Sequence, residues 1–439
     1  MNNSKTICPL PWIHIATRPN GDVRLCCTAN ASGSQLAQDI KDSGLIKDNN
    51  ISLNLTTSTI EEIWNSEFMK NTRLQMLKGQ EPLSCKKCFI EERNGISSKR
   101  NWETQVWKER IDLDKIIKNT NDDGSLPLYI PYFDLRLGNA CQLKCIMCSP
   151  HDSSSWIKDW KHQKNQYSDS LLKHDQDWNI NYNYQWFKKG NFLNSIKNQS
   201  DSIKELYFAG GEPLMIDEHY KILEFMIESG TANQCILRYN SNGLIFRSNL
   251  FKLWEHFKEV KFNFSIDALE SKNDYIRFPS KWSNVVSNLK IFDDTADNIT
   301  VNIACAVQAL NVINISDLAR WKIDQNFKKI NKAPFGAGVI GLHLVYLPSY
   351  LNIRVLPISL KKVASKNIEK FCSEMEFDYE FNNNPYGKQR WEGIIKYMFA
   401  EDWNSKISAL IQYINICDRN RSTNILDTFT ELEEIFNVN

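Results

Sequence analysis

Three closely spaced cysteines carry the strongest chemical signal in the sequence. Cys141, Cys145 and Cys148 follow the spacing C-x3-C-x2-C. Three thiolates can bind three irons of a cubane [4Fe-4S] cluster, which leaves the fourth iron open for an exogenous ligand. A structural zinc ion is the alternative, but it needs a fourth Cys or His, and only His151 lies nearby. The count of three therefore favours a cluster with one open iron.

A second group of cysteines lies in the N-terminal part of the chain. Cys8 and Cys26 are followed, after a long gap, by the C-x2-C pair Cys85 and Cys88. Four thiolates can hold either a zinc ion or a second iron–sulfur cluster, and spacing alone does not separate the two. Cys27 stands beside Cys26 and could replace it as a ligand. We expect an auxiliary metal centre here, with iron–sulfur favoured because the first group already indicates redox chemistry.

The elements that must position these cysteines follow from the hydrophobic pattern. Residues 12–15 and 23–25 alternate around an Asn-Gly turn, which predicts a hairpin, and residues 60–77 form one amphipathic helical pattern. Further along, short apolar runs alternate with helical segments, such as the one at 218–229. Six strand–helix repeats predict an α/β fold, a partial (β/α)6 TIM-like barrel. The candidate strands are residues 133–137, 205–208, 236–239, 262–266, 301–305 and 342–346.

These patterns predict four regions. Residues 1–100 form a small hairpin-containing cluster-binding domain, and 101–130 a linker rich in polar residues. Residues 131–350 form the barrel core, which carries an aromatic-rich insertion at 151–200. Residues 351–439 form a helical C-terminal region.

Several other motifs fall at the predicted C-terminal ends of the strands, where barrel enzymes build their sites. Together with the three-cysteine motif, the sequences Gly210-Gly211-Glu212-Pro213, Asn240-Ser241-Asn242-Gly243 and Ser265-Ile266-Asp267 resemble those of the radical S-adenosylmethionine (radical SAM) family. In that family the open iron binds S-adenosylmethionine, which is cleaved reductively to a 5′-deoxyadenosyl radical. The resemblance makes Cys141, Cys145 and Cys148 the catalytic cluster ligands. It assigns cosubstrate binding to Met147, Gly210, Gly211, Glu212, Pro213, Asn242, Ser265, Asp267, Arg277 and Gln308.

The N-terminal cysteines resemble the twitch domain, a shortened relative of the SPASM domain that binds an auxiliary [4Fe-4S] cluster. That resemblance makes Cys8, Cys26, Cys85 and Cys88 the auxiliary ligands. In most family members the auxiliary domain follows the barrel, whereas here it precedes it. A twitch-domain radical SAM enzyme implies S-adenosylmethionine as cosubstrate and a reductant such as flavodoxin or ferredoxin as partner.

The bulk composition sets limits on partners and location. Among 439 residues, 53 Lys and Arg oppose 52 Asp and Glu, so the charge balance gives no support to a nucleic-acid partner. The sequence has neither a long apolar run nor a signal-peptide pattern, and we therefore expect a cytoplasmic protein without a membrane anchor.

Two hypotheses for the function follow. The leading one is a radical SAM enzyme that abstracts hydrogen from an unidentified peptide, protein or small metabolite. The alternative is a zinc-stabilised, non-catalytic binding protein on a degenerate barrel. The glycines of the 210–213 turn and the polar residues of the later strand ends favour the enzyme.

Overall fold

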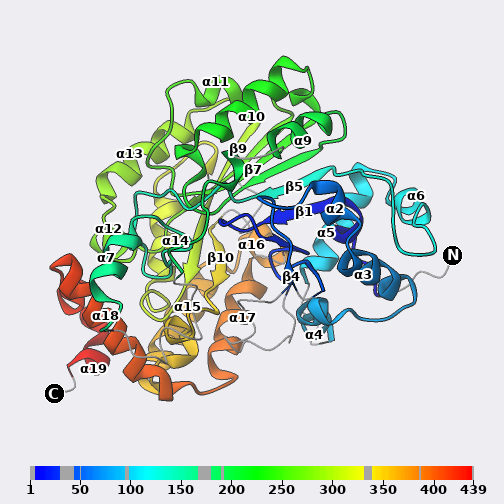
Figure 1. Cartoon of the computed structure of the whole chain (residues 1–439). Coiled ribbons are helices and arrows are strands. Elements are labelled where there is room, and N and C mark those ends of the chain that lie inside the picture. The colour runs from blue at the N-terminus through cyan, green and yellow to red at the C-terminus, as the bar shows by residue number, and fades with distance from the viewer. Residues whose placement is uncertain are drawn as a thin grey trace. The chain divides into compact units, whose positions relative to one another are not determined.

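The computed structural model describes residues 5–29, 44–49, 51–93, 98–166, 179–188, 192–330, 339–384 and 387–437 (Figure 1). Part of the insertion expected at 151–200, including Trp178, lies outside these residues. The chain divides into two compact units. The first comprises Met1–Asn139, Asn181–Arg238 and His256–Lys258, and the second comprises Ala140–Ile180, Tyr239–Glu255 and Glu259–Asn439.

The fold is mixed α/β, as the sequence predicted. Eight strands form a mostly parallel sheet in the order β10-β9-β8-β7-β6-β5-β1-β2. The six strands expected from the apolar runs are all present, with ends shifted by a few residues: β5 (Tyr132–Leu135), β6 (Glu205–Phe208), β7 (Ile236–Ser241), β8 (Glu259–Ser265), β9 (Ile299–Val307) and β10 (Gly341–Leu344). The α/β class is therefore confirmed, and the closure of these strands into a partial barrel stays a prediction.

The N-terminal hairpin is confirmed and has an additional role. Strands β1 (His14–Thr17) and β2 (Val23–Arg24) pair antiparallel, and β1 also pairs parallel with β5. The hairpin thus extends the sheet of the first unit instead of forming a separate sheet. Residues 12 and 13, expected in the strand, lie in the short helix α1 (Leu10–Ile13).

The helix expected over residues 60–77 is two helices, α2 (Ile60–Trp64) and α3 (Glu67–Leu77). Thr59 and Glu62 form a reciprocal capping box at the start of α2. Ser66 then accepts a hydrogen bond from the backbone N–H of Met69 and caps a new helix. The serine gives the chain a second helix start, which the continuous apolar pattern concealed.

Helices also occupy the segment expected to be a linker. They are α5 (Lys99–Arg110) and α6 (Leu113–Lys118), and the Trp107 side chain of α5 is completely buried. The first unit further contains β3 (Lys47–Asp48), β4 (Ile51–Ser52), α4 (Lys86–Arg93), α9 (Phe192–Asn198) and α10 (Asp217–Glu228), with short 3-10 turns η2 (Leu83–Cys85), η3 (Trp186–Lys188), η4 (Pro213–Met215) and η5 (Ala232–Gln234).

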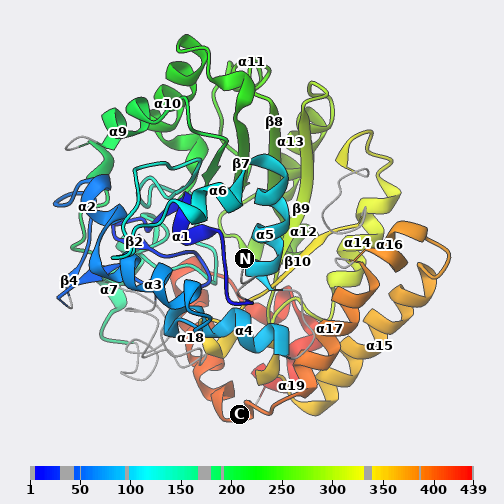
Figure 2. The ribbon, with the colours of Figure 1, turned by 90° about the vertical axis from the view of Figure 1, so that its right-hand side faces the viewer.

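The second unit carries the later strands and the C-terminal helices. Its helices are α7 (Trp156–Gln163), α11 (Leu250–Trp254), α12 (Glu270–Ile276), α13 (Trp282–Asp293), α14 (Ile315–Asp324), α15 (Ile358–Glu374), α16 (Tyr379–Asn383), α17 (Lys388–Phe399), α18 (Ile407–Arg421) and α19 (Glu433–Phe436). Figure 2 shows α15 and α17 side by side, where Phe371 packs on Trp391 with 4.5 Å between ring centroids. No helix in the described part of the chain has both the length and the apolar character that spanning a bilayer requires.

Candidate iron–sulfur sites

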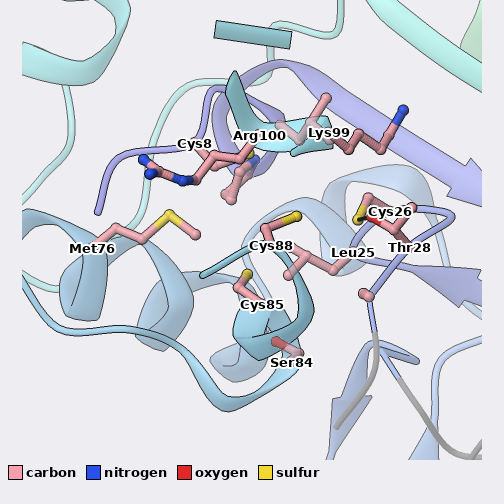
Figure 3. Close-up of a pocket in the computed structure, with 13 residues that line it drawn as sticks. Cys8, Leu25, Cys26, Thr28, Met76, Ser84, Cys85, Cys88, Lys99 and Arg100 are labelled. Atoms are coloured by element: carbon pink, nitrogen blue, oxygen red, sulfur yellow. Dashed lines mark hydrogen bonds between the residues drawn. The ribbon is translucent and has the colours of Figure 1, made fainter. Parts of the chain in front are cut away.

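The four N-terminal cysteines line one pocket in the first unit (Figure 3). Cys8 precedes α1, Cys26 follows β2, Cys85 ends the turn η2, and Cys88 lies in the first turn of α4. Residues up to 80 positions apart in the sequence thus present their thiols to the same space, because the hairpin and the η2–α4 segment fold against each other. The structure brings together all four cysteines that the sequence assigned to the auxiliary centre.

The pocket disfavours charged thiolates in the absence of a cation. Burial, together with the nearby Cys85 and Cys26, raises the pKa of the Cys8 thiol well above its usual value. Burial likewise raises the pKa of Cys26 to about 11, with a further contribution from Cys27. Metal ligation requires thiolates, so a bound cationic centre must supply the stabilisation that the protein interior lacks.

Two basic residues also line this pocket. Lys99 forms a 2.7 Å ion pair with Glu103, and Arg100 pairs with Glu92 and donates a hydrogen bond to the Ile7 carbonyl at 2.8 Å. Both cations come from the start of α5. They offset part of the negative charge that four thiolates would bring to a cluster.

The structure also separates the two adjacent cysteines. Cys26 is buried and lines the pocket, whereas Cys27 is half-buried and is not among the residues that line it. We therefore take Cys26 as the auxiliary ligand.

The three-cysteine loop lies in the second unit and has no regular secondary structure. Cys145 and Cys148 share a hydrogen bond, which lowers the pKa of the Cys145 thiol and raises the pKa of the Cys148 thiol. The Arg277 guanidinium lies 3.9 Å from the Cys145 sulfur. Cys141 is 4.0 Å from the Asn242 amide nitrogen. The loop therefore brings thiols next to a cation and an amide, both of which can stabilise thiolates.

Buried side chains from distant positions hold this loop. Trp156 of α7 donates a hydrogen bond to the Cys145 carbonyl at 3.1 Å, and the Tyr413 hydroxyl of α18 donates to the Ile146 carbonyl at 2.7 Å. Arg421, at the end of α18, donates to the Lys144 carbonyl. A loop without secondary structure needs such partners for its carbonyls. The C-terminal region thus fixes the geometry of the three-cysteine loop.

Asp267 and Arg277 form a buried ion pair beside that loop. The Arg277 Nε atom is 2.8 Å from the Asp267 carboxylate, whose other oxygen accepts the backbone N–H of Ala306 at 2.7 Å. Asn311 donates to the Asp267 carbonyl at 2.8 Å. The carboxylate of Asp267 is therefore engaged with the protein itself. In this arrangement it positions Arg277, and a direct role of Asp267 in cosubstrate binding stays a prediction.

Other cosubstrate candidates of the second unit occupy strand ends. Asn242 follows β7 and accepts a hydrogen bond from Gln142 at 3.0 Å, so it contacts the cysteine loop at two points. Ser265 ends β8, and Gln308 follows β9. The Gln308 side chain is completely buried, and neither amide atom has a hydrogen-bond partner in the described part of the chain. Such a group is typical of a site that a ligand completes. Met147 is half-buried in the cysteine loop.

The glycine turn belongs to the first unit and follows β6. Gly210 and Gly211 have φ values of 75° and 56°, a left-handed conformation that favours glycine. A Cβ atom on Gly210 would lie 2.6 Å from the Cγ atom of Arg136. Glu212 is buried and caps η4, which begins at Pro213, by accepting the backbone N–H of Leu214 at 3.2 Å. The turn is thus a rigid element whose backbone shape requires both glycines.

Sequence reasoning missed several residues that support these sites. Tyr413, Arg421 and Trp156 have no local motif, because their partners are backbone carbonyls more than ten residues away. Gln142 could have been found from the sequence, because it is a polar residue directly after the expected cluster ligand Cys141. Although Cys8, Cys26, Cys85 and Cys88 line one pocket, no three His, Cys, Asp or Glu side chains among the described residues lie in an arrangement that could hold a single metal ion.

Comparisons with known proteins identify the N-terminal region. Residues 8–89 match SPASM, an iron–sulfur cluster-binding domain. This match spans all four auxiliary cysteines and confirms both the SPASM-type domain and the iron–sulfur cofactor expected from the sequence. No curated protein sequence matches the chain. Among solved structures, Streptococcus suis SuiB bound to S-adenosylmethionine is 13% identical over 76% of this chain and 69% of that chain, with a TM-score of 0.30. SuiB bound to its precursor peptide SuiA is 14% identical over 74% and 65%, with a TM-score of 0.29.

Proposed function

We propose that this chain, which carries a SPASM-type iron–sulfur domain at residues 8–89, is a radical SAM enzyme with two [4Fe-4S] clusters. The observation that carries the proposal is the loop of Cys141, Cys145 and Cys148. It supplies three thiols with the Arg277 guanidinium beside the Cys145 sulfur. The Gln308 amide, which is buried and has no hydrogen-bond partner among the described residues, follows β9 of the same unit. Three ligands leave one iron of a cubane open to a cosubstrate.

The residues present fit such a group. A cluster bound by these thiolates would supply one electron for reductive cleavage of S-adenosylmethionine to methionine and a 5′-deoxyadenosyl radical. That radical would take a hydrogen atom from the substrate, which would leave 5′-deoxyadenosine and a substrate radical. The electron comes from an external reductant such as a flavodoxin or ferredoxin.

The protein's own residues orient the reactants. Arg277, held by Asp267, places a positive charge beside the Cys145 sulfur and stabilises the thiolate form. Asn242 holds Gln142 against the loop. By the family resemblance, the backbone of Gly210 and Gly211 and the Glu212 carboxylate bind the methionine part of the cosubstrate, and Ser265 and Gln308 bind its nucleoside part.

The auxiliary centre has the ligands Cys8, Cys26, Cys85 and Cys88 under this proposal. Four protein thiolates close a cluster to exogenous ligands, which suits electron transfer or structural support better than bond cleavage. Lys99 and Arg100 line the same pocket and favour the more negative, reduced form of a cluster there.

The test is anaerobic reconstitution followed by metal analysis and product detection. The proposal predicts about eight irons per chain and formation of 5′-deoxyadenosine after reduction with S-adenosylmethionine present. Cys145→Ala abolishes nucleoside formation, while Cys372→Ala, a change at an isolated cysteine of α15, retains it. Stoichiometric zinc without nucleoside formation would instead support the non-catalytic zinc protein and refute the proposal.

A further inference from the structure

One face of the first unit's sheet carries polar side chains where a core usually carries apolar ones. Strand pairing aligns Arg24 with Ala16, Ala16 with Asp134, and Asp134 with Tyr207. Residues aligned across a sheet point to the same face, and neighbouring strands lie about 4.8 Å apart. The four residues therefore form one row roughly 14 Å long. We call this the Arg24–Tyr207 row.

Arg136 joins the row from the end of β5. It lies two residues after Asp134, so its side chain points to the same face. Its Nη1 atom is 2.5 Å from the Asp134 carboxylate and donates to the Thr17 carbonyl at 3.2 Å. A Cβ atom on Gly210 would collide with the Arg136 stem, so the glycine permits Arg136 to lie against the turn. The row thus borders the turn to which we assign cosubstrate binding.

Two members of this group have buried polar atoms that no described residue satisfies. The Asp134 side chain is 1% exposed, and its Oδ2 atom has no hydrogen-bond partner among the described residues. The Arg24 Nε atom is likewise buried and unpartnered, although its Nη2 atom donates to the Ala29 carbonyl at 2.7 Å. An unsatisfied buried polar atom destabilises the folded protein, so such atoms point to a ligand that completes them.

The charges and sizes in the row indicate what that ligand is. Arg24 has no carboxylate partner among the ion pairs of the described chain, and Arg136 has further N–H donors beyond the one that binds Asp134. Two guanidinium groups favour a carboxylate, which each can bind through paired N–H donors. The open oxygen of Asp134 accepts a hydrogen bond from an N–H group. Ala16 lies between Arg24 and Asp134, and its small side chain leaves more room above the sheet there than a larger residue would.

We infer that the Arg24–Tyr207 row and Arg136 bind an amino-acid-type group of the substrate. Its carboxylate lies at Arg24 and Arg136, and its amine or amide N–H donates to Asp134. The inference rests on the proposed function, because it names the substrate class of that same enzyme. A free amino acid and the C-terminal residue of a peptide share this chemistry.

The test measures binding to the reconstituted full-length protein without S-adenosylmethionine. The probes are the free L-amino acids in one arm and tripeptides with free C-termini in the other, each compared with its carboxamide by saturation-transfer NMR. We expect saturable binding in one arm with a Kd of about 1 mM or below. Replacement of the carboxylate by a carboxamide weakens binding about tenfold or more, because a charge-assisted hydrogen bond is lost.

Variants locate the site. Arg24→Gln weakens binding of the carboxylate probe about tenfold. Asp134→Asn reduces the preference for the free amine over the trimethylated amine in the amino-acid arm, and for the amide N–H over its N-methylated form in the peptide arm. Arg93→Gln is the matched control, because Arg93 forms an exposed ion pair with Glu81 in the same unit. Iron content and melting temperature verify that each variant is folded.

The outcomes separate this inference from the proposed function. Absence of binding in both arms, or binding that neither the carboxamide nor Arg24→Gln weakens, overturns the inference. Nucleoside formation is measured independently and can succeed when the binding test fails. If Arg24→Gln loses iron, the Asp134→Asn variant serves as the test in its place. The inference is overturned if that variant still prefers probes with an N–H group over their methylated forms.

Discussion

Replacing Tyr413 with Phe tests how the three-cysteine loop is held. The change removes only a hydroxyl, whose hydrogen bond to the Ile146 carbonyl is 2.7 Å long and completely buried at both ends. An unsatisfied buried carbonyl costs about 1–3 kcal/mol. For a chain of 439 residues the unfolding entropy is about 0.9 kcal/mol per degree, so the melting temperature of Tyr413→Phe falls by about 1–3 °C.

The same loss is expected to weaken iron retention at the loop. An opening free energy reduced by about 1–3 kcal/mol raises the open population roughly 5- to 150-fold, and chelator removal of iron accelerates accordingly. The assay compares calorimetric melting and the rate of iron loss to a chelator under anaerobic conditions. Tyr379→Phe is the matched control, because the Tyr379 side chain on α16 is 79% exposed. If Tyr413→Phe behaves like this control in both measurements, the loop does not depend on α18 and the reasoning is refuted.

Three further predictions address the first unit. Cys26→Ser lowers iron content by up to about four per chain, whereas Cys27→Ser retains it, as measured by iron analysis after reconstitution; equal losses would contradict the assignment of Cys26. Burial lowers the pKa of His14 from 6.5 to about 4, so the imidazole binds a proton more readily in the unfolded protein than in the folded one. The free energy of unfolding therefore falls as the pH drops below about 6.5, by about 2 kcal/mol at about pH 5. His14→Gln should remove that slope in denaturant titrations, and an unchanged slope would count against it. Gly210→Ala should lower the melting temperature of the protein more than Gly230→Ala does. Both glycines have positive φ, but only at Gly210 would a Cβ atom meet an arginine side chain; equal melting temperatures would refute that contact.

The sequence predicted the strands because each is a short buried run bounded by turn residues. β6 begins and ends where the sequence predicted, at Glu205 and Phe208, and three of its four residues are buried. The cysteine groups were also readable, since ligand type and spacing are local properties of the chain. The choice between Cys26 and Cys27 was not readable, because it depends on which way each side chain points.

Other features depend on contacts between distant segments. The parallel pairing of β1 with β5 joins residues more than a hundred positions apart, and no local pattern distinguishes a hairpin that stands alone from one that extends a sheet. The polar residues of 101–130 suggested a linker, yet Trp107 is buried there and Arg110 pairs with Glu205 of β6. Tertiary ion pairs thus stabilise a helix that composition alone does not predict.

The central claim is that the three-cysteine loop holds a cluster whose open iron binds S-adenosylmethionine. Electron paramagnetic resonance of the reduced, reconstituted protein tests it most directly. We predict signals from two clusters, of which one changes on addition of S-adenosylmethionine and is lost in Cys145→Ala while the other persists. A spectrum that S-adenosylmethionine leaves unchanged in the fully loaded protein would contradict the claim.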